Sequence, residues 1–209
     1  MLRDLASKQD DEKSLKNIVD KASTVYEKHS ESPKIALVYL NVLYLLASHQ
    51  RFERSLKITE SKAATVYENH ADSEKNSTVY LQILCKLASK QEEEKSLKIT
   101  TDIANAVYEE SSKSEIDAGN YLSILYYLTS KHVNEKRISN VLVEADRIHE
   151  KYPESDKIAN TYIKILHNLA SKQQSETDLN DTASKATAVY ESSQNQKILL
   201  IIIFGVFVI

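Results

Sequence analysis

Metal binding is the first chemistry that the side chains suggest, because the chain carries six histidines and 30 acidic residues. Zinc sites on helices commonly pair two histidines one turn apart beside a glutamate, and thiolate sites pair closely spaced cysteines. Neither spacing occurs here, since His29 and His70 lie 41 residues apart and Cys85 is the only cysteine. Regularly spaced carboxylates of a calcium loop are also missing from the sequence. We therefore expect no metal and no cofactor.

The sequence likewise contains no motif for nucleophilic catalysis or for phosphate binding. Gly119 and Gly205 stand alone, so the sequence has neither a glycine-rich phosphate loop nor the glycine-flanked serine of a hydrolase. The run Glu92–Glu94 is typical of a solvated helix end, where carboxylates favour the helix dipole. The lone Cys85 is expected to be a partly buried small hydrophobe. These observations predict a non-enzymatic protein with no small-molecule substrate.

Composition narrows the class of partner and the compartment. The 27 basic residues are interspersed with 30 acidic ones and the net charge is −3, which disfavours nucleic-acid binding. Only two glycines and two prolines occur, which disfavours an all-β fold with many tight turns. A single cysteine cannot form an internal disulfide, and no apolar stretch follows Met1. We expect a cytoplasmic protein.

A repeat of 41 residues organises almost the whole chain. The segment Leu5-Ala-Ser-Lys-Gln returns in closely related form at Leu46, Leu87, Leu128 and Leu169, without insertion or deletion. Several further columns keep the same register. They are Ala22, Ala63, Ala104, Ala145 and Ala186; Tyr26, Tyr67, Tyr108, His149 and Tyr190; Tyr39, Tyr80, Tyr121 and Tyr162; and Leu43, Leu84, Leu125 and Leu166.

Each repeat is predicted to be a hairpin of two amphipathic helices, because its apolar residues recur at steps of three and four. The first stripe is Leu15, Ile18, Ala22, Val25 and Tyr26, and the second is Ile35, Val38, Tyr39, Val42, Leu43 and Leu46. The expected helix pairs cover residues 10–50, 51–91, 92–132 and 133–173, with a partial pair at 174–197. A hairpin cannot bury its stripes alone, so the copies must stack.

Serines mark the expected start of each second helix. Ser32, Ser73, Ser114 and Ser155 share one position of the repeat, where a hydroxyl can accept a hydrogen bond from an amide of the first helical turn. Pro33 follows Ser32 and suits the first helical position, because the missing N–H has no partner there in any case.

The pattern resembles the tetratricopeptide repeat. The residues that carry the resemblance are Ala22, Tyr26, Pro33, Tyr39, Leu43 and Leu46, with equivalents in the later copies. The unit is longer than the family's 34 residues and lacks its tryptophan and glycine, so tetratricopeptide-like is the fitting description. HEAT-type repeats share the length, but no motif here matches them better. The resemblance implies an all-α solenoid over residues 1–197, a right-handed superhelix of antiparallel helix hairpins that holds a protein or peptide in its concave groove.

The same resemblance places the helix containing Tyr39 on the concave face. Positions of that helix outside the packing columns differ between copies, as expected either for a solvated face or for ligand contacts. The candidate groove residues are Asn41, Tyr44, Gln82, Lys86, Ser123, Tyr126, Tyr127, Lys164, His167 and Asn168.

Both ends of the chain depart from the repeat. Leu2 and Leu5 correspond to Leu43 and Leu46, so the sequence opens partway through a second helix, which suggests part of a longer array. Residues 198–209 are uninterrupted apolar sequence. As a helix they would span roughly 18 Å, short of the ~30 Å hydrocarbon core of a bilayer. A membrane tail anchor, a degenerate capping helix and a truncation artefact remain alternatives, and the first would make the protein a membrane-associated scaffold.

Overall fold

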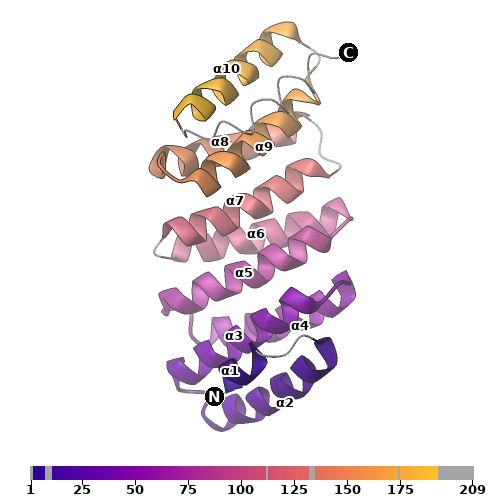
Figure 1. The fold of residues 1–209 in the computed structure, drawn as a ribbon, viewed down its shortest axis with the longest axis vertical. Helices are drawn as coiled ribbons and strands as arrows, with labels where there is room; N and C mark the ends of the chain where they lie inside the picture. Colours follow the sequence, from indigo (N-terminus) through magenta and orange to yellow (C-terminus); the bar gives the residue numbers. More distant parts are fainter. Residues whose placement is uncertain (1, 8–10, 112, 132–134, 174, 193–209) are drawn as a thin grey trace. The chain divides into compact units, whose positions relative to one another are not determined.

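The computed structural model describes residues 2–7, 11–111, 113–131, 135–173 and 175–192, and its regular structure there is entirely α-helical (Figure 1). Short linkers separate helices that are mostly 15 to 17 residues long. The helices in chain order are α1 (Leu2–Ala6), α2 (Glu12–Lys28), α3 (Pro33–His49), α4 (Glu53–Glu68), α5 (Glu74–Lys90), α6 (Glu94–Glu110), α7 (Glu115–Ser130), α8 (Glu135–Lys151), α9 (Asp156–Ala170) and α10 (Glu176–Ser192). The all-α class expected from the sequence is confirmed.

The chain forms two compact units, Met1–Asn120 and Tyr121–Ile209, and the division falls within α7. Helices α2, α4, α6, α8 and α10 are called the first helices of the repeats, and α3, α5, α7 and α9 the second helices. The solenoid expected over residues 1–197 concerns both units together and stays a prediction. The apolar segment 198–209 lies outside the described residues.

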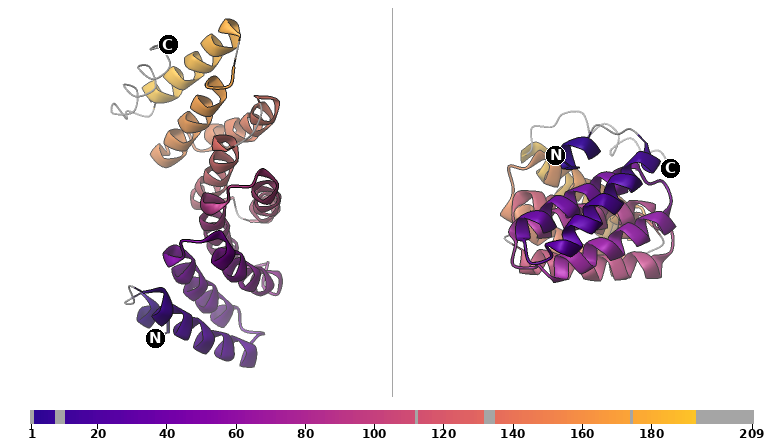
Figure 2. Two further views of the ribbon diagram at one scale, coloured as in Figure 1. Left: turned by 90° about the vertical axis from the view of Figure 1, so that its right-hand side faces the viewer. Right: turned by 90° about the horizontal axis from the view of Figure 1, so that it is seen from below.

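In the first unit the second helices form the centre of the packing. Helix α3 packs against α1, α2, α4 and α5, and α5 also packs against α4 and α6 (Figures 1 and 2). Small residues permit this close approach, because Ala36 and its equivalent Ser77 are buried at the start of α3 and α5. The columns of leucine and valine or isoleucine at Val42, Leu43, Ile83 and Leu84 are fully buried. Burial of these apolar side chains is the main stabilising contribution.

In the second unit α9 packs against both α8 and α10. Ile138 and Leu169 form a buried cluster, against which Leu128 and Leu142 pack. The columns of the first unit recur here, with Ile165 and Leu166 of α9 buried in place of Val42 and Leu43. The aromatic column recurs as well, since the ring of His149 stacks on that of Tyr162 at a centroid distance of 4.9 Å.

The serine positions ahead of the second helices are only partly the caps that the sequence predicts. Ser155 Oγ accepts a hydrogen bond from the Ile158 amide at 3.5 Å, and Ser114 Oγ accepts one from the Asp117 amide at 3.2 Å. Ser32 and Ser73 occupy the same position with extended backbone, but neither side chain makes a capping hydrogen bond. The prediction of a hydroxyl cap is therefore wrong at these two, although Pro33 does occupy the first position of α3 as predicted.

Four residues of the predicted apolar stripes are not buried, of which two are exposed and two are partly exposed. Val25 is 39% exposed, although its equivalents Val66 and Val107 are 1% and 3% exposed. Those equivalents lie on helices that each follow a complete hairpin, whereas only the five-residue α1 precedes α2 among the described residues. Val38 is 38% exposed, and Ile18 and Ile35 are partly exposed, while Val19 takes a buried place in α2.

Candidate interaction surfaces

The ten candidate groove residues all lie on second helices and keep contact with solvent. Lys164 and His167 are exposed, and the other eight are partly exposed. The neighbouring column of the same helices behaves in the opposite way, because Val42, Ile83, Ile124 and Ile165 are 0% exposed. The second helices therefore present an accessible strip that differs between copies beside a buried strip that does not. Residues of the accessible strip are Asn41 and Tyr44 on α3, Gln82 and Lys86 on α5, Ser123, Tyr126 and Tyr127 on α7, and Lys164, His167 and Asn168 on α9.

In the second unit the structure brings several of these side chains together. The Lys164 ammonium lies 5.8 Å from the ring centroid of Tyr126, a cation–π distance. The rings of Tyr126 and Tyr127 are tilted against each other with centroids 5.4 Å apart. The Asn168 side-chain amide donates a hydrogen bond to Thr129 Oγ1 at 3.0 Å. Helices α7 and α9 thus contribute the aromatic pair Tyr126 and Tyr127, the Lys164 cation and the Asn168 amide.

In the first unit the candidates are on neighbouring helices, since α3 packs against α5. The side-chain amide of Asn41 already donates a hydrogen bond within its own helix, to the Leu37 carbonyl at 2.7 Å. Cys85, at the position equivalent to Tyr44, is partly buried, as expected for a small hydrophobe.

A second surface, which the sequence analysis missed, lies between two first helices. Side chains of α2 and α4 flank a groove with a volume of about 350 Å³, and the end of α3 closes its base. None of the ten candidate residues contributes to it. The lining residues are Lys16, Val19 and Asp20 of α2, Leu46 and Gln50 at the end of α3, and Arg54, Ser55, Ile58, Thr59 and Lys62 of α4.

Positive charge dominates this groove, which we call the α2–α4 groove. Lys16, Arg54 and Lys62 face only one acidic lining residue, Asp20. Lys16 is paired with Glu12 of its own helix at 2.8 Å, but more than half of the lysine side chain is exposed. Such an exposed pair contributes little and remains open to competition. Arg54 and Lys62 form no ion pair with the described residues.

Polar contacts between successive repeats hold these helices in place. Tyr67 donates its hydroxyl proton to Glu110 Oε2 at 3.3 Å, and the Tyr26 hydroxyl at the equivalent position accepts from the Asn69 side-chain amide at 3.3 Å. In each case the partner lies in the following repeat. On the second helices Thr78 Oγ1 donates to Asp117 Oδ1 at 2.7 Å. These contacts between successive repeats belong to the framework of the fold.

In the α4–α5 and α8–α9 hairpins the aromatic columns pair with each other and with acids. The rings of Tyr67 and Tyr80 stack at 5.0 Å, and the Tyr80 hydroxyl donates to Glu60 Oε1 at 2.6 Å. Burial raises the pKa of Tyr80, and the Glu60 carboxylate raises it further because it opposes a second negative charge. Tyr162 is equivalent, with burial and its hydrogen bond to Asp146 both raising its pKa. These hydroxyls are therefore neutral structural donors rather than reactive phenolates.

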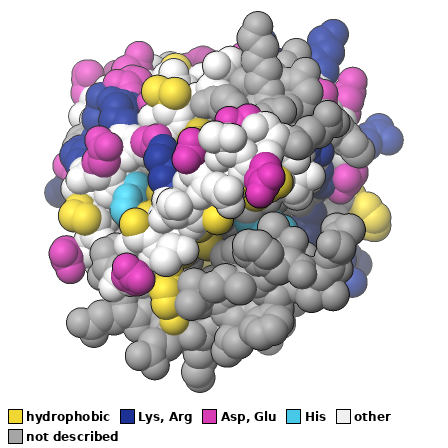
Figure 3. Space-filling view, turned by 90° about the horizontal axis from the view of Figure 1, so that it is seen from above, with side chains coloured by type: hydrophobic (Ala, Val, Ile, Leu, Met, Phe, Trp, Pro, Cys, Tyr) yellow, Lys and Arg dark blue, Asp and Glu magenta, His cyan; other side chains and the backbone are white. Residues whose placement is uncertain are grey.

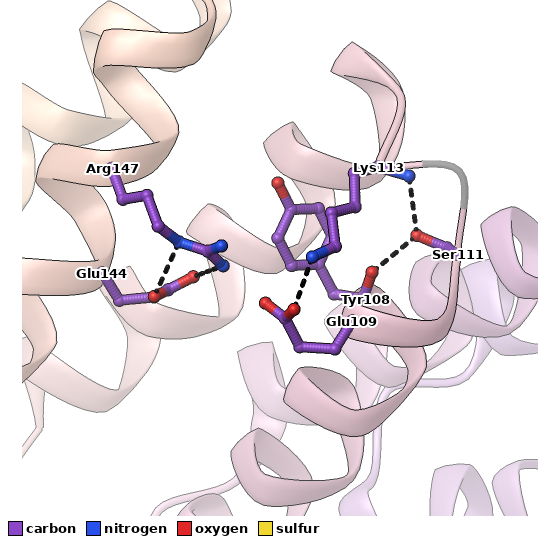
Figure 4. Close-up of polar contacts among 6 residues, drawn as sticks. All are labelled: Tyr108, Glu109, Ser111, Lys113, Glu144 and Arg147. Carbon is purple, nitrogen blue, oxygen red and sulfur yellow. Dashed lines mark hydrogen bonds and ion pairs between the residues drawn. The ribbon is translucent and has the colours of Figure 1, made fainter.

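Some charged contacts are local, whereas the Lys185 ammonium of α10 reaches Asp146 of α8 at 2.7 Å. On α8 the Arg147 guanidinium donates to Glu144 through Nη2 at 2.6 Å and Nε at 3.2 Å (Figure 4). In the linker after α6, Ser111 Oγ donates to the Tyr108 carbonyl and accepts from the Lys113 amide, while the Lys113 ammonium donates to Glu109 (Figure 4). Figure 3, a view of the molecule from above, shows acidic and basic side chains interspersed over the described part of the surface seen from that side. Such exposed pairs solvate helix faces and stabilise the fold only weakly.

Metal-binding clusters and membrane-spanning helices are both absent from the described residues. Among the described residues, no group of three or more histidine, cysteine or acidic side chains is placed to hold a metal ion. None of the described helices combines the length and the apolar character needed to cross a bilayer.

Comparison with known proteins gave no match for the chain among family models, curated proteins or solved structures. Its two surfaces, the accessible strip of the second helices and the α2–α4 groove, are therefore the basis for assigning a function.

Proposed function

We propose that the chain is a non-enzymatic, tetratricopeptide-like scaffold whose second helices bind a partner peptide or helix. One observation carries the proposal: apolar columns that repeat along the second helices are buried, and the variable positions beside them remain accessible. Val42 and its three equivalents are fully buried, whereas Asn41, Gln82, Ser123 and Lys164 change in type at one accessible position. A framework that fixes only the buried columns lets the accessible residues change without loss of stability, which suits a repeat protein that recognises a partner.

The side-chain chemistry of the accessible strip supports a peptide ligand. Tyrosine provides a large contact area with little loss of conformational entropy, and amide side chains can pair with the peptide backbone. Tyr126, Tyr127 and Asn168 supply both kinds of contact in the second unit, and Lys164 adds a positive charge. In the first unit Lys86 offers a partly exposed cation on α5.

An experiment with selected peptides tests this function. Peptides would be selected from a displayed random library on the full-length protein, and their affinities measured by fluorescence anisotropy for Lys86→Glu, Lys164→Glu and the matched control Lys75→Glu. Lys75 is exposed on α5 and lies outside both surfaces. We expect at least one of the first two reversals to weaken binding about tenfold, while the control leaves it unchanged. If all three variants bound the peptides as tightly as the original protein, the second helices would be excluded as the binding surface.

The alternative is a membrane-tethered scaffold, favoured by the apolar sequence of residues 198–209. These residues lie outside the described part of the chain, so this alternative is supported by sequence alone. Fractionation of full-length protein and of a variant lacking residues 198–209 separates the two possibilities. A tether predicts that only the full-length protein sediments with membranes, and recovery of both forms in the soluble fraction would exclude it.

A further inference from the structure

We propose that the α2–α4 groove is a separate docking site for an acidic peptide that carries one apolar anchor residue. The site is distinct from the accessible strip of the second helices, so the two proposals stand or fall independently. The inference combines the shape of the groove, its apolar centre and its unbalanced charge.

The apolar centre comes from Ile58, with Val19 and Leu46 beneath it. Ile58 is 59% exposed on α4, while Val19 and Leu46 are buried where they line the groove. A large aliphatic side chain left in solvent inside a concavity gains stability when another apolar group covers it. The volume of about 350 Å³ falls at the lower end of the range for ligand sites, about 300 to 1,000 Å³. It suits one or two side chains rather than a whole folded domain.

The charges around that centre select an acidic ligand. Arg54 and Lys62 lie one turn to either side of Ile58 on α4, and Lys16 stands opposite on α2. Arg54 and Lys62 lack ion pairs within the described residues, so two cations are uncompensated at this surface. Opposite charges on a ligand would be attracted to them, and basic peptides would be repelled. Asp20 is the single lining carboxylate and reduces this preference only in part.

The polar side chains at the base of the groove already form a hydrogen bond with each other, so they do not need one from a ligand. Thr59 Oγ1 donates to Gln50 Oε1 at 2.9 Å, and both residues are buried. The groove is therefore preorganised, which lowers the entropic cost of binding. The cations and Ile58 around its mouth remain available to a ligand.

The same chemistry continues over α4 and recurs in part in the next repeat. A shallow hollow on α4 includes Ile58 and Lys62 together with Lys57, Ser61 and Thr65. One repeat later, the equivalents of Lys16, Arg54 and Ile58 are Lys57, Lys95 and Ile99, and Ile99 is also 53% exposed. The next repeat therefore keeps the exposed isoleucine of the groove and one cation that is unpaired among the described residues. Ile103 stands in place of Lys62, however, and Lys57 is paired with Glu53 at 2.7 Å.

The test uses a short fluorescein-labelled peptide of aspartates and glutamates around one leucine, titrated against the full-length protein by anisotropy. Two comparison peptides replace the acids by lysine or the leucine by serine. We expect saturable binding only of the peptide that carries both the acidic residues and the leucine. Added salt should weaken this binding because the charges are exposed. Arg54→Glu with Lys62→Glu should weaken binding about tenfold or more, and Ile58→Ser should weaken it to a smaller extent. All three positions are solvent-accessible, and circular dichroism verifies that the variants fold.

Two control variants distinguish a loss of binding at the groove from a general effect of charge reversal. Lys75→Glu makes the same charge change outside the groove, and Lys86→Glu makes it on the second helices. Unchanged binding by both controls supports the α2–α4 groove. No binding up to about 1 mM, an equal effect of Lys75→Glu, or equal binding of the lysine peptide would overturn the inference. Loss of binding by Lys86→Glu alone would also overturn it and assign the acidic peptide to the second helices. The inference would also be overturned if a second copy of the chain occupied the α2–α4 groove, or if the protein bound anionic vesicles through this groove in the absence of the peptide.

Discussion

The Oγ1 hydroxyl of Thr59 donates a hydrogen bond of 2.9 Å to the side-chain amide oxygen of Gln50, across the linker between α3 and α4. Both side chains are buried, at 2% and 6% exposure. The pair recurs as Thr182 and Gln173, with a distance of 3.0 Å between Oγ1 and Oε1. A buried polar contact of this kind fixes how the end of one hairpin meets the start of the next.

Replacing Thr59 by valine should destabilise the protein measurably. The substitution keeps the shape of the side chain but leaves the buried Gln50 oxygen without its donor, which costs about 1 to 3 kcal/mol. Denaturant unfolding followed by circular dichroism measures the change. The matched control is Thr100→Val at the equivalent position, because Gln91 Oε1 is buried without a hydrogen-bond partner. Thr100→Val should therefore cost less than Thr59→Val, and equal costs would contradict the role assigned to the hydrogen bond.

Alkaline conditions should destabilise the fold through its buried tyrosines. Burial raises the pKa of Tyr39, Tyr67 and Tyr80 above the ordinary value of 10.0. Because the unfolded chain loses these protons at lower pH than the folded chain, stability is fully present below pH 10 and decreases as the pH rises further. Tyrosinate absorbance and circular dichroism, recorded together, should show that part of the ionisation coincides with unfolding. In Tyr80→Phe the loss of stability above pH 10 should be smaller, and an unchanged slope would refute the contribution of Tyr80.

How far the sequence predicted these features depends on whether they are periodic. The buried column at Leu43, Leu84, Leu125 and Leu166 could be predicted because apolar residues at a fixed step must share one environment. The contact between Gln50 and Thr59 was missed, although its signal is present: glutamine and threonine recur nine residues apart at 91 and 100 and at 173 and 182.

The α2–α4 groove could not be predicted in the same way. Lys16, Arg54 and Lys62 are spread over more than one repeat, and each is the kind of residue that any solvated helix face carries. Only the placement of α2 beside α4 gathers them around Ile58. Periodicity also failed at Val25, because it assigns a residue to a helix face but does not say what covers that face.

Equivalent valines should therefore respond differently to truncation. Val66→Ala removes two methyl groups from a side chain that is 1% exposed, so it should cost about 2 kcal/mol. Val25→Ala makes the same change at 39% exposure and should cost less than about 0.5 kcal/mol. Both are measured by denaturant unfolding of the full-length chain. Similar losses at the two positions would mean that Val25 is covered in solution.

Mildly acidic conditions should destabilise the second unit through His149, which takes the place of a tyrosine in its column. Its Nε2 atom is buried without a hydrogen-bond partner, and the ring stacks on Tyr162. Burial lowers the pKa of His149 below 6.5, although the Asp146 and Glu150 carboxylates oppose this shift. The unfolded chain therefore binds the proton more tightly than the folded one, so the stabilising contribution is present above pH 6.5 and is lost as the pH falls below it.

The variant His149→Tyr tests this directly, because it restores the residue found in the other copies of the column and removes the titrating group. We expect its stability to vary less between pH 7 and pH 5 than that of the original protein, as measured by denaturant unfolding at each pH. His167→Gln is the matched control, since His167 is exposed on α9. Because His167 lies on the surface and outside the stacked pair, its replacement should leave the pH dependence in place. If His167→Gln flattened the profile and His149→Tyr did not, the acid sensitivity would belong to the surface of α9 rather than to the stacked pair.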